Sequence, residues 1–174
     1  MKITMIGAGA MGGATVEGLI KGERFKNEDI TVADPSQQVL EKFARQSVSV
    51  TTLWSIFRSP LMLGTDLPQL DDFNLSLITN DEILAMNKNP YQAFLSSDSS
   101  NENVVIWTND CPDDLSYYEC YFNVSEEVQT VKLNITIGKE DNIRDLWEHK
   151  DLGASTSFKL EPHSCKAFKI SVTR

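Results

Sequence analysis

The pattern of apolar and polar residues begins with two short β-prone runs on either side of a helical stretch. The runs are residues 2–6 and 29–33, and the residues from Ala14 to Lys21 have helical character. Glycines between the first run and the helix predict a tight turn there. The order of strand, glycine turn, helix and strand predicts a parallel βαβ unit.

The pattern then predicts a second helix over residues 36–45 and the start of a third strand over residues 47–51. Asp34 ends the second β-prone run, and it can cap the helix with Pro35 in the tolerated first position. The strand prediction rests on strict alternation. Around Leu53 the character of the sequence changes.

The next segment predicts one buried strand and a pair of helical turns. Residues 59–64 are an apolar run that fits a buried strand. Asp72 is placed to cap an amphipathic helix, and Thr79 and Glu82 have the spacing of a capping box for a further turn. Residues 96–103 are rich in Ser and Asn and predict an exposed linker.

From Val104 onward the period is two, which predicts a sheet. Acidic or glycine-containing turns separate the runs, and such spacing is typical of an antiparallel sandwich. The predicted strands are residues 104–108, 117–123, 130–137, 143–147, 156–160 and 165–172.

Composition divides the chain near residue 50. The net charge of the 174 residues is -9, yet residues 1–50 hold six basic and six acidic side chains, so the excess negative charge lies beyond them. Six of the nine glycines fall within the first 22 residues. A chain this acidic, without a basic cluster, is not expected to bind nucleic acid. Its longest apolar runs are too short for a transmembrane helix, so we expect no membrane partner.

The glycine turn is the clearest candidate binding motif. It has the G-x-G-x-x-G spacing and opens a helix after a strand, the context in which backbone amides bind a pyrophosphate. Asp34, at the end of the next strand, can accept a hydrogen bond from a ribose hydroxyl. The alternative is an incidental glycine-rich turn. The candidate cofactor-binding residues are Gly7, Gly9, Ala10, Met11, Gly12 and Asp34.

Residues 3–14 (ITMIGAGAMGGA), with residues 18–20 (GLI) and 32–36 (VADPS), resemble the N-terminus of pyrroline-5-carboxylate reductase. The resemblance covers about the first fifty residues and implies binding of NAD(P). Position 10 is Ala where that family usually has Asn, so the binding is expected to be weak.

A second resemblance covers the remaining 120 residues or so. Residues 53–67 and 75–87 are similar to the eighth strand and helix of the (β/α)8 barrel of α-galactosidases, the melibiases of glycoside hydrolase family twenty-seven. Further motifs resemble that family's C-terminal β-sandwich. They are residues 105–107 (VIW), 121–125 (YFNVS), 143–148 (IRDLWE), 150–153 (KDLG) and 160–163 (LEPH).

The second resemblance implies no catalytic residue in this chain, because that family's nucleophilic and acid/base Asp residues come from earlier barrel strands. Asp66 follows a barrel-like strand, where active-site groups gather in complete barrels, but we interpret it as a loop or capping residue. The sequence therefore predicts an α+β chain without a complete active site. Its parts are a partial Rossmann-type βαβ unit (1–50), a barrel-remnant strand and helix (51–95) and a C-terminal antiparallel β-sandwich (96–174).

Three functions remain open at this point. The chain can be a catalytically incomplete fusion or remnant whose main part is the α-galactosidase-like sandwich, an NAD(P)-binding fragment of an oxidoreductase, or a sugar-binding module. Its expected partners are at most a small carbohydrate or a dinucleotide. In the absence of a signal peptide, we expect a cytoplasmic location, and the oligomeric state stays open.

The remaining candidate side chains have structural interpretations. Cys111, Cys120 and Cys165 lack metal-site spacing, and we expect free, partly buried thiols. His149 and His163 fall in sandwich turns, without an evident complementary Cys, Ser or carboxylate. Aromatic residues can stack on sugars, but we interpret them here as core. The aromatic candidates are Trp54, Trp107 and Trp147.

Overall fold

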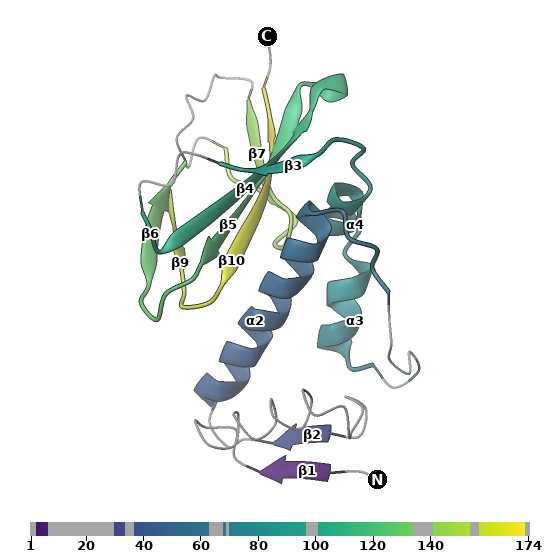
Figure 1. Ribbon diagram of the computed structural model, residues 1–174, viewed down its shortest axis with the longest axis vertical. Coiled ribbons are helices and arrows are strands. Elements are labelled where there is room, and N and C mark those ends of the chain that lie inside the picture. Colours follow the sequence, from purple (N-terminus) through teal and green to yellow (C-terminus); the bar gives the residue numbers. More distant parts are fainter. Residues whose placement is uncertain are drawn as a thin grey trace.

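The computed structural model describes residues 3–6, 30–33, 37–62, 68, 70–96, 101–133, 141–153 and 157–172. Figure 1 shows a sheet with a long helix, α2, packed beside it and two shorter helices on the other side of that helix. The elements are β1 (Ile3–Ile6), β2 (Ile30–Ala33), α2 (Gln37–Ile56), α3 (Asp72–Thr79), α4 (Asp81–Asn87), β3 (Ala93–Leu95), β4 (Val104–Cys111), a 3-10 turn (Pro112–Asp114), β5 (Ser116–Asn123), β6 (Gln129–Lys132), β7 (Asn142–Asp145), β8 (Lys150–Asp151), β9 (Ser157–Leu160) and β10 (Cys165–Ser171).

The N-terminal strands β1 and β2 form a two-stranded parallel pair. Their register places Ile3 opposite Ile30 and Ile6 opposite Ala33. Parallel pairing agrees with the order of elements expected from the sequence. The connecting residues 7–29, with the glycine turn, lie outside the described residues, as do Asp34 and the segment 63–67 that contains Asp66.

The C-terminal part is built on a six-stranded antiparallel sheet with the order β3-β4-β5-β10-β7-β8. A second sheet, β6-β9, is antiparallel and two-stranded. All six predicted strands after Val104 are present, and β7 ends at Asp145, earlier than predicted. Strand β6 ends at Lys132, and residues 134–137 of its predicted range lie outside the described residues. The antiparallel sandwich expected from the period of two is thus confirmed in its main elements.

Alternation along the central strands divides the interior into two cores. On β5, Tyr118, Cys120 and Phe122 face the helices, whereas Tyr121 belongs to the core between the two sheets. On β10, Ala167 faces the helices, and Phe168 and Ile170 face the small sheet. Because both faces of the large sheet are covered, its central strands β5 and β10 bury apolar residues on both faces.

Helix α2 corrects the prediction of a strand over residues 47–51. It runs without interruption to Ile56, well past the predicted end at residue 45. Hydroxyl groups in this segment donate to carbonyls one turn earlier, from Ser47 to Phe43, from Thr51 to Ser47 and from Thr52 to Val48. The alternating Ser, Val and Thr residues therefore have helical partners, and five alternating positions are too few to exclude a helix.

Two helix caps also differ from the predictions. Asp71, not Asp72, caps α3, and its carboxylate accepts from the backbone N–H of Asn74 at 2.7 Å. Asn80, not Thr79, caps α4, and its Oδ1 accepts from the N–H groups of Glu82 and Ile83 at 3.0 Å. Each observed cap is the direct sequence neighbour of the residue that was predicted. Asp and Asn are both strongly preferred at this position, and a sequence pattern alone does not fix a helix end to a single residue.

Two other segments depart from the sequence analysis. Residues 59–62 do not form the predicted buried strand, and Met62 is exposed. Pro60 lacks the N–H that an interior strand would need. The short edge strand β3, which pairs with β4 from Ala93↔Asn109 to Leu95↔Trp107, was not predicted. In the described part of the chain, no helix is long and apolar enough to span a membrane.

Candidate functional site

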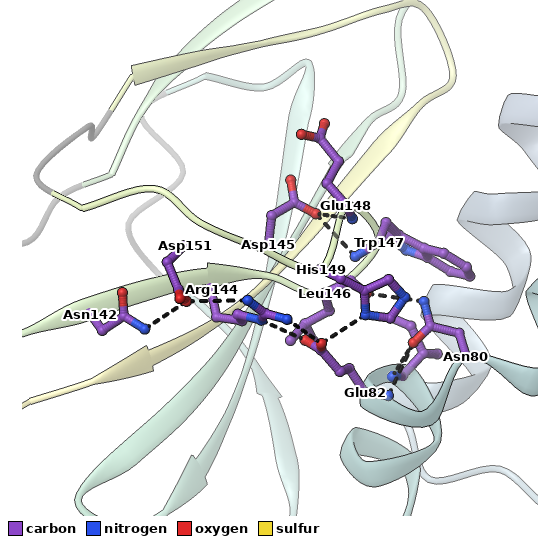
Figure 2. Close-up of polar contacts among 11 residues, drawn as sticks. Asn80, Glu82, Asn142, Arg144, Asp145, Leu146, Trp147, Glu148, His149 and Asp151 are labelled. Carbon is purple, nitrogen blue, oxygen red and sulfur yellow. Dashed lines mark hydrogen bonds and ion pairs between the residues drawn. The ribbon is translucent and has the colours of Figure 1, made fainter.

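None of the candidate cofactor-binding residues can be placed. Gly7, Gly9, Ala10, Met11, Gly12 and Asp34 all lie outside the described residues. The described part of the chain instead gathers its polar side chains where the helices α2 and α4 meet the large sheet (Figure 2). The residues 143–148, which we call the IRDLWE segment, form the centre of that junction.

Arg144 joins the sheet to α4. Its guanidinium donates to both carboxylate oxygens of Glu82, from Nε at 3.1 Å and from Nη2 at 2.7 Å. Nη1 lies 3.5 Å from the carboxylate of Asp151 on the neighbouring strand β8. A planar two-point contact is the strongest form of carboxylate pairing, so this bond fixes the start of α4 against β7.

Asp145 is the most buried charged group of the junction, with 1% of its side chain exposed. Its Oδ1 accepts from the backbone N–H groups of Trp147 and Glu148, both at 3.0 Å, and so closes the turn after β7. Its Oδ2 accepts from the Lys166 ammonium at 2.7 Å. A buried carboxylate is tolerated only when it is paired and hydrogen-bonded in this way.

Leu146 and Trp147, which follow Asp145, connect the sheet to α4 and α2. The Leu146 carbonyl accepts from the Asn80 side chain at 3.0 Å, while the Leu146 side chain is in the helix-side core. The Trp147 Nε1–H donates to Thr52 Oγ1 on α2 at 2.9 Å. Asn80 thus caps α4 with its oxygen and holds the turn after β7 with its nitrogen.

The charges of the junction are arranged to remain ionised. The hydrogen bond from Arg144 holds the pKa of the Glu82 carboxyl below its usual value, although partial burial acts in the opposite direction. The same pairing raises the pKa of Arg144. The hydrogen bond from Lys166 lowers the pKa of Glu148. The favoured state of the junction near neutral pH is therefore a set of ion pairs.

Both histidines lie in turns, as predicted, but each contacts a carboxylate that the sequence did not reveal. His149 Nδ1 lies 2.7 Å from Glu82 Oε1, and His163 Nε2 lies 2.9 Å from Glu126 Oε1. Both have positive φ, 52° and 56°, a backbone state uncommon for residues other than glycine. These side chains therefore hold turns to neighbouring elements.

Three side chains bring possible metal ligands together. Ligand atoms of Asp81, Glu82 and His149 lie within 4.8 Å of one another. The Glu82 carboxylate, however, already receives both bonds from Arg144. A cation there would lie beside the guanidinium and compete with it, so we interpret the group as an ion-pair network.

The three tryptophans have different environments. Trp147 and Trp107 are partly buried and pack against the helix-side core, as expected, and Trp107 meets Phe57 edge to face at a centroid distance of 4.3 Å. Trp54 corrects the prediction of a core residue, because 52% of it is exposed.

Two hollows open near the junction. A groove of about 620 Å³ lies between α2 and the strands β4 and β5, with apolar walls that include Leu53, Trp107 and Phe122. A smaller pocket of about 270 Å³ lies beside the end of α4, lined by Tyr91, Lys169 and other polar residues. Lys169 there is paired with Asp114 at 2.6 Å, and the Tyr91 hydroxyl donates to Asp113 at 3.0 Å.

The part of the chain that matches a known family contains this junction. Residues 89–170 match the family model of the alpha galactosidase C-terminal beta sandwich domain. That range holds β3 through most of β10, including the IRDLWE segment. The resemblance of the C-terminal region to glycoside hydrolase family twenty-seven is thereby confirmed.

Individual relatives extend the likeness into the helices. Alpha-galactosidase 3 of Arabidopsis thaliana is 25% identical over 131 residues, 69% of this chain and 30% of that protein. The structure of a GH27 β-L-arabinopyranosidase from Geobacillus stearothermophilus matches 75% of this chain and 31% of its own, with 34% identity and a TM-score of 0.64. Isomalto-dextranase of Arthrobacter globiformis is 30% identical over 65% of this chain and 20% of that protein. The chain thus spans a third or less of the length of these relatives.

Proposed function

We propose that this chain serves as a non-catalytic sandwich-and-helix module of the α-galactosidase type, associated with carbohydrate hydrolysis. The observation that carries the proposal is the match of residues 89–170 to the C-terminal sandwich domain of α-galactosidases. The module's role is to hold helices α2 and α4 in a fixed position on the sheet through the IRDLWE segment.

The range of the relatives supports a role in architecture over one in choosing a substrate. An α-galactosidase, a β-L-arabinopyranosidase and an isomalto-dextranase all share this portion with the chain. Their names point to different sugars, so the shared portion is unsuited to setting the specificity. Function resides in sites and not in folds, and the shared side chains here hold elements together.

The bonding of the junction supports the same role. Three side chains of the segment bind other elements of the chain. Arg144 binds Glu82 on α4, Asp145 binds Lys166 and the turn after β7, and Trp147 binds Thr52 on α2. Side chains engaged in this way are not available for proton transfer to a sugar without breaking the junction. We therefore expect no glycosidase turnover from this chain alone.

The activity assay uses the purified 174-residue chain with a chromogenic α-galactoside. We expect release of the chromophore at the rate of the buffer blank, and the same rate for Asp66→Asn. Turnover by the native chain that disappears in Asp66→Asn would contradict the proposal, because it would place a working carboxylate in the chain. A circular dichroism spectrum with β-sheet character establishes that the assayed protein is folded.

A sugar-binding module is the second candidate, and the aromatic pair Trp107 and Phe57 at the groove favours it. Aromatic faces stack on sugars, but specificity needs free polar groups near them. At this groove the Asn123 amide already donates to three backbone carbonyls, and the Ser49 hydroxyl donates to the His163 carbonyl. These two donors are therefore engaged within the chain, which argues against specific sugar recognition by them. Titration with galactose and arabinose, followed by tryptophan fluorescence, tests this candidate. Saturable binding lost in Trp107→Ala would favour it over a purely architectural role.

A further inference from the structure

Helix α2 carries an exposed apolar stripe on one side. Its members follow one another at intervals of three, four, three, four and three residues, the spacing of the inner positions of a coiled coil. Ser47 is the small polar member near the middle, and the apolar members are Leu40 (42% exposed), Phe43 (37%), Val50 (46%), Trp54 (52%) and Phe57 (41%). Phe57 follows the helix directly, and its N–H still bonds to the Leu53 carbonyl at 3.1 Å.

The centre of the stripe lies away from the side of α2 that packs on the sandwich, whereas Val50 and Phe57 at its edge also line the groove against β4 and β5. Thr52, Ser55 and Ile56 are fully buried, and Val48 packs against the same core. At 100° per residue these four side chains point about 110° to 170° away from the centre of the stripe. A helix with apolar residues on both sides is normally covered on both sides. Among the described residues, the sandwich and the helices α3 and α4 contact α2, and the five apolar members of the stripe are still 37% to 52% exposed.

The exposed area is large enough to form the centre of an interface. At the exposures given above, the five apolar side chains leave roughly 400 Å² open, a patch of the size that marks interaction sites on single chains. The groove beside α2 continues this surface, because Val50 and Phe57 belong to both. The stripe alone supplies about half of the roughly 800 Å² that each partner buries in a standard interface.

We propose that the α2 stripe binds the α2 stripe of a second copy of this chain, with the two helices antiparallel. A two-fold axis between Ser47 and Val50 pairs Leu40 with Phe57 of the other copy, and Phe43 with Trp54. The third layer pairs Ser47 with Val50. Each of these pairs then combines a larger with a smaller residue or brings two aromatic rings together. A parallel arrangement would instead place Trp54 against Trp54 and Ser47 against Ser47.

The charges of α2 permit this pairing. Between its two ends, the positions that flank the stripe are Ala44, Gln46, Thr51 and Leu53, none of which is ionisable, and Arg58 flanks its C-terminal end. The charged residues of this part of the helix, Glu41, Lys42 and Arg45, lie outside the contact strip. The net charge of -9 opposes association at long range, but salt at about 0.15 M screens charges beyond roughly 8 Å. Two copies therefore meet no charge repulsion at the contact.

The shape of the molecule also permits it. The N-terminal half of α2 extends beyond the sheet toward β1 and β2, while the sandwich lies on the C-terminal half (Figure 1). An antiparallel partner would place its own sandwich at the opposite end of the helix pair. This interface does not depend on the proposed function, since it requires neither turnover nor sugar binding.

Sedimentation velocity of the purified chain tests the proposal, in about 0.15 M salt and from about 1 μM to about 100 μM. We expect a species of twice the 19.5 kDa chain mass at the upper concentrations. Val50→Glu places two carboxylates beside the two-fold axis and should raise the dissociation constant at least about 100-fold. Val128→Glu is the matched control, because Val128 is 49% exposed in the β5–β6 connection, against 46% for Val50.

A dimer that persists in Val128→Glu and is lost in Val50→Glu supports the proposal. A native chain that is monomeric at every concentration overturns it, and so does a dimer that tolerates Val50→Glu or is lost equally in both variants. Equal thermal unfolding curves for the two variants establish that both fold. If Val50→Glu fails to fold, Trp54→Gln takes its place, with at least about a tenfold weakening expected.

Cysteine pairs then test the antiparallel arrangement. Residues 40 and 57 are 17 positions apart, about 25 Å along one helix, so they can form a disulfide only between two chains. In the proposed dimer, Leu40→Cys combined with Phe57→Cys should give a covalent dimer on mild oxidation, whereas Leu40→Cys alone should not. The reverse result, with Leu40→Cys crosslinking alone, would establish a parallel pair and overturn the arrangement. The native chain, with its own three cysteines, is the background control.

Discussion

Replacing Asp145 should separate the two tasks that the structure gives to its carboxylate. In Asp145→Asn the side-chain oxygen can still accept from the N–H groups of Trp147 and Glu148, as Oδ1 does now at 3.0 Å. The other carboxylate oxygen, which accepts from Lys166 at 2.7 Å, is replaced by an amide donor that faces the ammonium. The turn should therefore persist while the buried ion pair is lost.

The magnitude follows from the burial of the two charges. Removing one partner of a buried pair costs about 3 to 5 kcal/mol, because the other charge stays buried without compensation. Lys166 is 24% exposed and keeps its bond to Glu148, so the expected cost lies at or below the lower end of that range. We expect Asp145→Asn to lower the free energy of unfolding by about 2 to 3 kcal/mol. Asp145→Ala should cost about 2 kcal/mol more, because it also loses two backbone hydrogen bonds.

Urea unfolding monitored by circular dichroism gives these differences, with Glu148→Gln as the control. Glu148 also pairs with Lys166 but is 53% exposed, so its loss should cost at most about 1 kcal/mol. For a chain of this size, the expected loss in Asp145→Asn corresponds to a fall in Tm of roughly 5 to 10 °C. Equal stability of Asp145→Asn and Glu148→Gln would refute the view that the buried pair with Lys166 stabilises the junction.

Three further predictions concern the neighbouring contacts and the N-terminal segment. Because the folded pKa of Glu82 is depressed, the stability it contributes is present above its ordinary value of 4.5 and should be lost as the pH falls through the folded value, and Glu82→Gln should flatten the stability profile in this acid range. Trp147→Phe, which removes the bond to Thr52 Oγ1, should cost about 1 kcal/mol in thermal unfolding, and no loss would mean that this bond contributes nothing to the junction. NADPH should bind weakly at best in a calorimetric titration, and a low-micromolar dissociation constant abolished by Gly9→Val would show a far more complete site than we expect.

The strands of the sandwich could be predicted from the sequence because their physical cause is local. Each central strand alternates between two covered faces, as Tyr118, Cys120 and Phe122 do with Tyr121, and turns of acidic residues separate the runs. Register and neighbours follow from the sheet order, which places β10 between β5 and β7. That order is not a local property, so the strands could be predicted from the sequence but their pairing could not.

The junction could not be predicted in the same way. Glu82 and Arg144 are 62 residues apart, and Thr52 and Trp147 are 95 apart, so only the folded topology brings them together. The sequence did single out residues 143–148 as a family motif and Glu82 as a cap residue, which were the available signals. The exposure of Trp54 was not predicted, because an aromatic residue on an apolar helix face is ordinarily part of a core.

The change of composition near residue 50 does not coincide with a structural boundary. It falls inside α2, and Val48 and Ile56, on either side of it, pack on the same core. Thr52 is fully buried within this stretch, where it donates to the Val48 carbonyl, accepts from the Trp147 indole and lies 3.2 Å from the Cys165 sulfur. A fragment that began at Leu53 would lose this residue and leave the Trp147 N–H without its partner. The body built on the sandwich must therefore include the helix at least from Val48, whatever the origin of the residues before it.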